Sequence, residues 1–167
     1  TIRGIKPIYI NSLINVLRKS DYKIETNDDN ITITKEKEPK VINITIGPYP
    51  NFPTDLGQPL SVLATQIKGH STIKETIFKN RYSHVEELNA MGANINVIDN
   101  IINIEGITNM NPKEVTAHDL RGAASLVLAG SLNTVPTTIN NIDVFLRGYE
   151  NPIEKLASFG LDAKFTD

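Results

Sequence analysis

The sequence predicts an α/β domain with internal pseudo-symmetry, in which helices lie inside and sheets outside. Two observations predict this fold class. First, an Asp-Leu pair precedes an apolar, helix-like run twice, at Asp55 and at Asp119, which are 64 residues apart. Second, a short amphipathic helix followed by a turn and a strand occurs three times, with the turns at Asp21, Gly92 and Gly160. Self-similarity at this spacing indicates a repeated structural unit.

The first part of the chain predicts one helix and three strands. Residues 8–19 carry apolar side chains every three or four positions, the spacing of an amphipathic helix. Residues 24–26, 31–34 and 41–46 alternate apolar and polar side chains, as strands with one buried face do. Residues 28–30, an Asp-Asp-Asn run, supply a hairpin turn between the first two strands.

A proline-rich segment leads into the first apolar helix. Residues 47–53 contain three prolines, which fix backbone dihedrals and remove amide donors, so we expect a rigid loop. Asp55 follows this loop and stands at the start of the expected helix, where aspartate is a common cap. The helix is expected over about 60–68 and closes at Gly69, and a strand is expected over 71–78.

The same order of elements then recurs. Because the helix that starts at Asp119 is apolar on nearly every side and contains small residues, we expect it to be buried, like the helix after Asp55. A third amphipathic helix and a final short strand that reaches Ala163 end the chain. The remaining expected elements are a helix over 83–91 and strands over 93–98, 101–104, 114–117 and 137–142.

Composition excludes several classes of protein. The formal charge of −2 and the pI of about 5.9 give no broad cationic surface for nucleic acid. No stretch approaches the roughly 18 apolar residues that a membrane helix needs. Zero cysteines exclude a thiolate metal site or nucleophile within these residues, and His70, His84 and His118 lack metal-ligand spacing. We therefore expect a soluble, cytoplasmic protein with no metal, no membrane contact and no nucleic-acid partner.

Charged residues recur where apolar elements end in loops. Asp55, Asp119 and Arg121 stand at the two helix starts, and Arg81 and Arg147 follow other elements of the repeat. Because the repeat relates these joints, they should gather at one end of the domain. Arginine forks bind carboxylate and phosphate bidentately, and a nearby carboxylate can take a proton from a hydroxyl, so an anionic-substrate site is indicated. The alternative is that each aspartate is only a helix cap.

Six segments, in order and at the right spacing, resemble the UDP-N-acetylglucosamine enolpyruvyl transferase family, specifically its C-terminal part. The resemblance runs over essentially the whole chain, and several motifs in register are more specific than any one of them. The segments are 52–55 (FPTD), 75–81 (ETIFKNR), 84–88 (HVEEL), 91–93 (MGA), 119–130 (DLR followed by SLVLAG) and 147–150 (RGYE).

The resemblance implies an architecture. Members of this family have two domains, each built from three βαβαββ units about a pseudo-threefold axis, an arrangement called an inside-out α/β barrel. The chain resembles about two and a half units of one such domain. It is therefore expected to be a single truncated domain over 1–167, with a partial unit over about 1–46 and further units over about 47–110 and 111–167. The other domain of the same protein is the expected partner.

The resemblance also implies a reaction and its residues. A sugar hydroxyl oxygen adds to carbon 2 of phosphoenolpyruvate, and the tetrahedral ketal then eliminates phosphate, with no cofactor or metal. This step belongs to bacterial peptidoglycan synthesis. The residue matching Asp55 is the base on the hydroxyl side, and those matching Ile77 and Phe78 contact the UDP-sugar. Those matching Arg121 and Arg147 bind the phosphoenolpyruvate side.

Other residues of the site, and the departures from the family, follow from the same comparison. Arg81 is expected in the same polar cluster, and Asp119 is a further candidate. The family usually has a histidine and an aspartate where this chain has Val144 and Leu146. The catalytic acid and a Lys-Asn pair lie in the other domain, so the chain alone is expected to be inactive. Two alternatives remain: a shikimate 3-phosphate enolpyruvyl transferase, or a non-catalytic binding domain that keeps this barrel.

Overall fold

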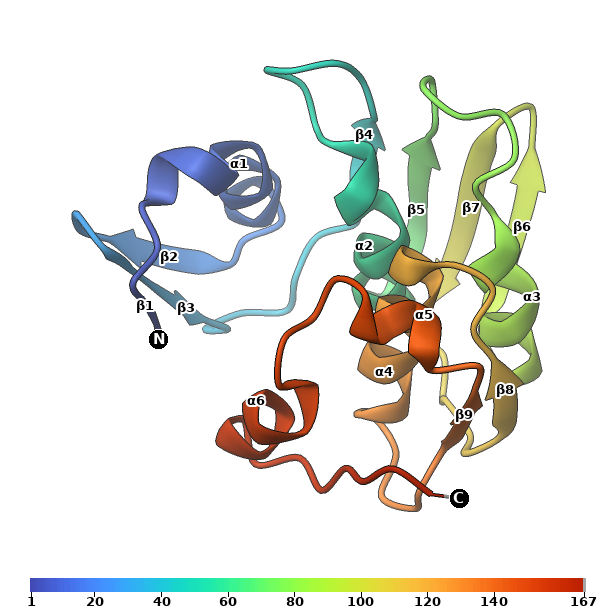
Figure 1. Ribbon diagram of the computed structural model, residues 1–167. Helices are drawn as coiled ribbons and strands as arrows, with labels where there is room; N and C mark the ends of the chain where they lie inside the picture. The colour runs from blue at the N-terminus through green and yellow to red at the C-terminus, as the bar shows by residue number, and fades with distance from the viewer. Residues whose placement is uncertain (167) are drawn as a thin grey trace.

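Two helices, α2 (Gly57–Thr65) and α4 (Leu120–Gly130), pack against each other at the centre of the molecule, with sheets and shorter helices around them (Figure 1). They are the two apolar runs that follow the Asp-Leu pairs. The computed structural model describes residues 1–166. Small side chains such as Ala64 and Ala123, each fully buried, let the two helices approach closely. The expectation of buried helices inside and sheets outside is confirmed.

The N-terminal segment forms a small layer of its own. Its three strands form an antiparallel sheet in the order β1-β3-β2, and its helix covers one face. Four buried side chains, Ile14, Leu17, Ile24 and Ile31, form a core separate from the main one. The elements are β1 (Ile2–Arg3), a 3₁₀ turn (Pro7–Ile10), α1 (Asn11–Lys19), β2 (Lys23–Thr26) and β3 (Asn30–Thr34).

The main sheet has four strands in the order β4-β5-β7-β6. The first pair is parallel and the other two pairs are antiparallel. Alternating side chains such as Ile73, Ile102 and Ile104 are buried against α2 and α4, so one face of the sheet covers the central helices. The strands are β4 (Asn43–Thr45), β5 (Gly69–Lys74), β6 (Asn94–Ile98) and β7 (Ile101–Gly106), and the helix α3 (Ser83–Ala90) precedes β6.

The last part of the chain surrounds α4. Strand β8 (Glu114–Thr116) precedes α4 in the sequence and β9 (Thr138–Asn140) follows it. The two strands pair in parallel. Two short helices follow, α5 (Asp143–Leu146) and α6 (Pro152–Ser158). Phe145 of α5 is buried in the main core, which fixes the loop after it against the start of α4.

The three repeat-related turns share one backbone conformation. Asp21, Gly92 and Gly160 each follow the last turn of a helix with φ of +66°, +102° and +80°. A left-handed residue after the helix end is the usual way to satisfy its last carbonyl groups. The predicted turns at Asp21, Gly92 and Gly160 therefore lie at the C-terminal ends of three helices.

Three element boundaries differ from the predictions. The strand expected over 71–78 ends at Lys74, because the next residue, Glu75, turns the chain through hydrogen bonds to its own loop. The helix expected over 60–68 runs from Gly57 to Thr65, and Gly69 begins a strand instead of closing the helix. Within the described residues, the segment after Gly160 forms no strand, so the final strand is absent.

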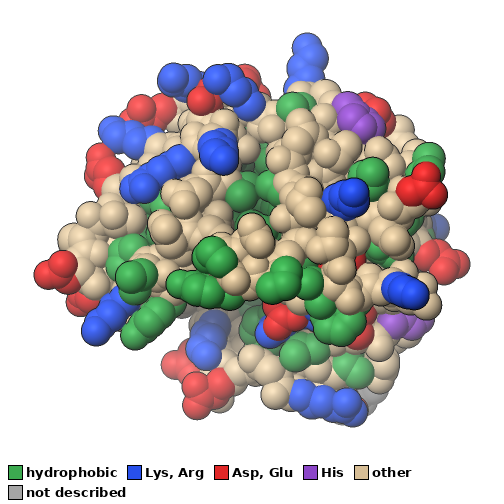
Figure 2. Space-filling view, turned by 90° about the horizontal axis from the view of Figure 1, so that it is seen from above, with side chains coloured by type: hydrophobic (Ala, Val, Ile, Leu, Met, Phe, Trp, Pro, Cys, Tyr) green, Lys and Arg blue, Asp and Glu red, His purple; other side chains and the backbone are tan. Residues whose placement is uncertain are grey.

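The surface is mixed. No helix among residues 1–166 is long and apolar enough to cross a membrane. Figure 2 views the molecule from above. Hydrophobic side chains gather across the lower half of this view, and most lysines and arginines lie toward its edge. Large exposed hydrophobic residues include Ile8, Tyr9, Tyr49 and Phe159.

Candidate functional site

A hollow of about 570 Å³ opens beside the starts of α2 and α4. Both helices begin at this end of the molecule, and so does the loop that follows β5. Five of the seven sequence-predicted site residues line the hollow, and three of these, Asp55, Arg81 and Arg121, come from three separate segments. The full lining is Asp55, Phe78, Lys79, Asn80, Arg81, Asp119, Leu120 and Arg121.

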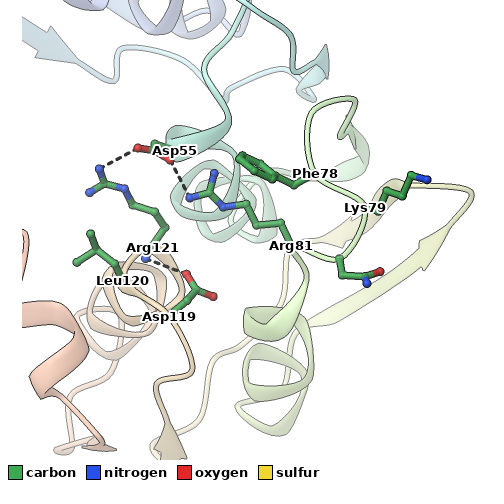
Figure 3. A pocket seen from close by; sticks show the side chains of 8 residues that line it. Asp55, Phe78, Lys79, Arg81, Asp119, Leu120 and Arg121 are labelled. Atoms are coloured by element: carbon green, nitrogen blue, oxygen red, sulfur yellow. Dashed lines mark hydrogen bonds and ion pairs between the residues drawn. The ribbon is translucent and has the colours of Figure 1, made fainter.

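Asp55 lies between two guanidinium groups (Figure 3). Its Oδ1 accepts a hydrogen bond from Arg81 Nη2 at 2.7 Å, and its Oδ2 accepts one from Arg121 Nη2 at 2.9 Å. The Asp55 side chain is 49% exposed, whereas those of Arg81 and Arg121 are 22% and 26% exposed. The carboxylate is therefore open to the hollow, and the two cations that hold it are partly shielded from water.

The pKa of Asp55 reflects these neighbours. Burial by itself would raise the pKa of the carboxyl group, but hydrogen bonds and charge from Arg121 and Arg81 outweigh burial. The resulting pKa is below the ordinary aspartate value, so the group is ionised at neutral pH. An ionised carboxylate can accept a proton from a hydroxyl group that is placed against it.

The two repeat-related aspartates have different local roles. Asp119 caps α4: its Oδ1 accepts hydrogen bonds from the backbone amides of Arg121 at 3.0 Å and Gly122 at 2.9 Å. Asp55 lies in a 3₁₀ turn, Thr54–Leu56, and makes no cap hydrogen bond to α2. Asp119 is therefore a helix cap, whereas Asp55 is not. The side chain of Asp55 is free to face the arginines.

Each arginine has a second anchor. Arg81 Nη1 donates to Thr54 Oγ1 at 2.9 Å, and its Cζ lies 5.1 Å from the ring centroid of Phe78. Arg121 Nη1 donates to the hydroxyl of Tyr149 at 3.0 Å. Both guanidinium groups are thus fixed by a hydroxyl as well as by Asp55. Fixed forks of this kind can bind a phosphate or carboxylate group bidentately.

Buried polar groups beneath the hollow hold these segments in place. Asp119 Oδ2 accepts a hydrogen bond from Ser83 Oγ at 2.5 Å, which ties the start of α3 to the start of α4. Burial would raise the pKa of Asp119, but hydrogen bonds from Ser83 and from the Gly122 and Arg121 amides hold it below its ordinary value. His84 is 1% exposed, and burial lowers its pKa to about 4, so its imidazole is neutral at pH 7.

The structure places the other predicted residues at the edge of the site. Ile77 and Phe78 are 41% and 50% exposed, and Phe78 lines the hollow. Arg147 is exposed at the end of α5, and it is absent from the lining of the hollow and from the ion pairs among the described residues. The structure therefore brings Arg81 and Arg121 to Asp55 but does not bring Arg147 there.

Sequence reasoning missed three residues that contact the cluster. Thr54 and Tyr149 supply the hydroxyl groups on Arg81 and Arg121, and Glu75 anchors Thr54 in turn. All three lie within segments that carried the resemblance. The sequence of a motif does not indicate which distant cation a hydroxyl group will contact. The sequence therefore shows that Thr54, Tyr149 and Glu75 are present but not what they contact.

Metal ligation finds no support in the side-chain arrangement. Among residues 1–166, no group of three or more His, Asp or Glu side chains converges on a point that could hold an ion. His70 pairs with Glu105 and His118 with Glu87, each across neighbouring elements.

Residues 1–156 match the family model of EPSP synthase (3-phosphoshikimate 1-carboxyvinyltransferase). The curated relatives include the UDP-N-acetylglucosamine 1-carboxyvinyltransferases of Pseudothermotoga lettingae, 39% identical over 93% of this chain, and of Pelagibacter ubique, 42% identical over 98%. The chain spans 38% and 39% of the length of these two proteins. It therefore corresponds to less than half of each.

Solved structures with the same fold are also enolpyruvyl transferases. The enolpyruvyl transferase NikO from Streptomyces tendae superposes with a TM-score of 0.84 at 26% identity, covering 91% of this chain and 35% of that one. An EPSP synthase from Acinetobacter baumannii superposes with a TM-score of 0.70 at 17% identity, covering 93% and 37%. The predicted enolpyruvyl transferase fold is confirmed.

Proposed function

The chain belongs to the EPSP synthase family, and on that premise we propose that it forms one wall of the substrate cleft of an enolpyruvyl transferase. The reaction is the transfer of the enolpyruvyl group of phosphoenolpyruvate to the 3-hydroxyl of UDP-N-acetylglucosamine, with release of phosphate. In bacteria this reaction supplies a peptidoglycan precursor. We place this reaction in the cytoplasm as part of the proposal.

One observation supports this function above the others: the carboxylate of Asp55 is held between Arg81 and Arg121 at the rim of an open hollow. An ionised carboxylate can take the proton of the attacking sugar hydroxyl. The two guanidinium groups can bind the phosphate and carboxylate groups of phosphoenolpyruvate. A proton acceptor and an anion site within one hydrogen-bonded cluster are what addition of a hydroxyl to an anionic enol ester requires.

The remaining residues of this wall would bind the substrates. Ile77 and Phe78 present exposed apolar side chains beside Arg81, which suits the nucleotide-sugar. Arg147 is exposed and unpaired among the described residues, so it is available to a phosphoenolpyruvate that enters from the side of α5. A movement of Arg147 toward Arg121 would bring it to the anion.

We propose that a second domain of the same protein supplies the opposite wall. The matched relatives are more than twice as long as this chain, which leaves room for such a domain. The acid that protonates the methylene carbon of phosphoenolpyruvate would come from it. Within this chain, we propose units over about 1–46, 47–110 and 111–167.

UDP-N-acetylglucosamine is favoured over shikimate 3-phosphate as the acceptor. Relatives named for the UDP-sugar are 31% to 42% identical to this chain, whereas the similarity to the EPSP synthase of known structure is 17% and reports the fold alone. The two acceptors also differ in chemistry, because only the first carries a uracil ring for Phe78 to contact.

Titration of the ¹⁵N-labelled chain tests the acceptor. We expect UDP-N-acetylglucosamine to shift the resonances of Ile77, Phe78 and Arg81, and an equal concentration of shikimate 3-phosphate to leave them in place. The reverse result would overturn the assignment. Because one wall lacks the proposed acid, we also expect the chain to release no phosphate from the two substrates together. Detectable release would contradict the two-wall proposal.

A further inference from the structure

A buried carboxylate lies directly behind the wall of the hollow. Glu75 follows the last residue of β5 and is 5% exposed. Its two oxygens accept three hydrogen bonds, all from segments that reach the hollow. A buried carboxylate with several donors is fixed in position, since breaking any one of these hydrogen bonds leaves a charged group poorly solvated.

One oxygen of Glu75 shapes the loop that presents Phe78. Glu75 Oε1 accepts hydrogen bonds from the backbone amides of Ile77 at 2.6 Å and Phe78 at 3.2 Å. These two bonds end the strand and turn the chain, so that the side chains of Ile77 and Phe78 emerge beside the hollow. The conformation of this loop therefore depends on a single carboxylate oxygen.

The other oxygen sets the position of Arg81 through one intermediary. Glu75 Oε2 accepts the hydroxyl hydrogen of Thr54 at 2.7 Å. Because that hydrogen is used, the lone pairs of Thr54 Oγ1 are free to accept a hydrogen bond from Arg81 Nη1, which lies at 2.9 Å. Glu75 thereby fixes the direction of the hydrogen bond on which the orientation of Arg81 depends.

We propose that Glu75 is a positioning residue that fixes Phe78 and Arg81 relative to each other for recognition of the nucleotide-sugar. This inference rests on the proposed function for its ligand. The two groups it positions already contact each other, with Arg81 Cζ 5.1 Å from the centroid of the Phe78 ring. Glu75 does not reach the ligand itself, because the loop and Thr54 lie between.

The arrangement of Arg121 makes the effect selective. The Arg121 guanidinium donates to Tyr149 and to Asp55, and neither residue hydrogen-bonds to Glu75. Loss of the Glu75 carboxylate should therefore disturb the side of the hollow that carries Phe78 and Arg81 more than the Arg121 side, which Tyr149 also holds. A residue needed only for folding would affect both sides equally.

The test is Glu75→Gln in the full chain. The carbonyl oxygen of the substituted amide can still accept from the Ile77 and Phe78 backbone amides, although more weakly than a carboxylate. Its NH2 group then faces the Thr54 hydroxyl, which loses its acceptor, and the Arg81 contact weakens. We expect the Phe78 amide and Arg81 Nε resonances to move in the ligand-free protein. We also expect the affinity for UDP-N-acetylglucosamine to fall about tenfold, as loss of one charge-assisted hydrogen bond implies. The affinity for phosphoenolpyruvate should fall by less, about threefold, because Arg121, the other guanidinium group of the anion site, keeps its hydrogen bond to Tyr149.

Glu87→Gln is the matched control. Glu87 is also a largely buried carboxylate, with a side chain 18% exposed, that accepts a backbone amide, from Thr116, and contacts a side chain, His118. It holds β8 and not the loop of Phe78. We expect comparable destabilisation without any shift at Phe78 or Arg81.

The outcomes separate the two proposals. Unmoved Phe78 and Arg81 resonances in folded Glu75→Gln, or an equal loss of affinity for both ligands, would overturn the positioning role. If the wild-type chain binds neither ligand, the proposed function fails. The Phe78 amide and Arg81 Nε resonances of the ligand-free protein still test the role of Glu75. If Glu75→Gln does not fold, Thr54→Val provides the test. This variant should shift the Arg81 Nε resonance and leave the Phe78 amide resonance in place. An unshifted Arg81 Nε resonance would refute the link through Thr54.

Discussion

Asp55 and Arg121, 66 positions apart in the chain, join the start of α2 to the start of α4 through an ion pair of 2.9 Å. Arg81 contacts the other oxygen of the same carboxylate. Asp55 therefore pairs with two cations in the ligand-free protein, and the cluster keeps a net positive charge. An anion that binds these guanidinium groups has to compete with Asp55, unless Asp55 takes up a proton or turns toward another partner.

This competition predicts opposite effects on the two ligands when Asp55 is replaced by Ala. With the guanidinium groups of Arg81 and Arg121 released, we expect the affinity for phosphoenolpyruvate to rise about fivefold or more, a change of roughly 1 kcal/mol. Affinity for UDP-N-acetylglucosamine should fall, since a hydrogen-bond acceptor for its hydroxyl is gone. Calorimetric titration of each ligand measures both effects, and weaker binding of phosphoenolpyruvate would contradict the competition.

Asp119 predicts a stability effect that depends on pH. Replacing this cap by Ala should cost about 1 kcal/mol of unfolding free energy at pH 7. The pKa of Asp119 is lowered in the folded state, so its charge stabilises the fold above the unfolded-state value of 3.8. That contribution is lost as the pH falls through the lower, folded-state pKa. Urea unfolding should therefore show the deficit of Asp119→Ala shrinking in strong acid, and a constant deficit would contradict this prediction.

The buried His84 should give the free energy of unfolding a second pH dependence, at higher pH than that of Asp119. Its pKa falls from 6.5 to about 4 on folding because it is buried, so protons favour the unfolded state. Stability is full above pH 6.5 and declines as the pH is lowered to about 4, by up to about 3 kcal/mol. Urea unfolding of wild type and His84→Leu measures this slope, which the variant should lose. His70→Gln, at an exposed histidine, should retain it.

The repeat-related turns predict a graded response to alanine. Gly92 and Gly160 both have a positive φ, so Ala at either position costs about 1 kcal/mol in backbone strain. A Cβ at Gly92 would also lie 2.8 Å from the backbone oxygen of Asn109, whereas Gly160 has open space around it. Thermal unfolding should therefore rank Gly92→Ala below Gly160→Ala in stability. The opposite order would show that the Gly92 neighbours relax freely.

The sequence was sufficient for features that depend on local patterns. The apolar runs after Asp55 and Asp119 predicted the buried helices, and the recurring helix-turn pattern predicted turns at Asp21, Gly92 and Gly160, where the structure has residues with positive φ. These features depend on side-chain periodicity and on backbone conformations that few residues adopt. Such determinants can be read without knowledge of distant contacts.

Features that depend on distant contacts could not be predicted in detail. The charged joints were expected to gather, yet nothing in the sequence distinguishes Arg81, which reaches Asp55, from Arg147, which remains exposed. The strand that was expected to continue through Phe78 stops because the carboxylate of Glu75 competes for backbone amides. That choice depends on where Thr54 lies, which only the folded chain determines.

The separate core of the N-terminal layer implies a second level of cooperativity. Four buried residues hold α1, β2 and β3 together, and Leu13 and Leu63 are the apolar side chains that pack against both this core and the main one. A layer with so few shared contacts should undergo sub-global opening before the main body unfolds. In native-state hydrogen exchange, the β2 and β3 amides would then exchange as one group, sooner than those of β5 and β7.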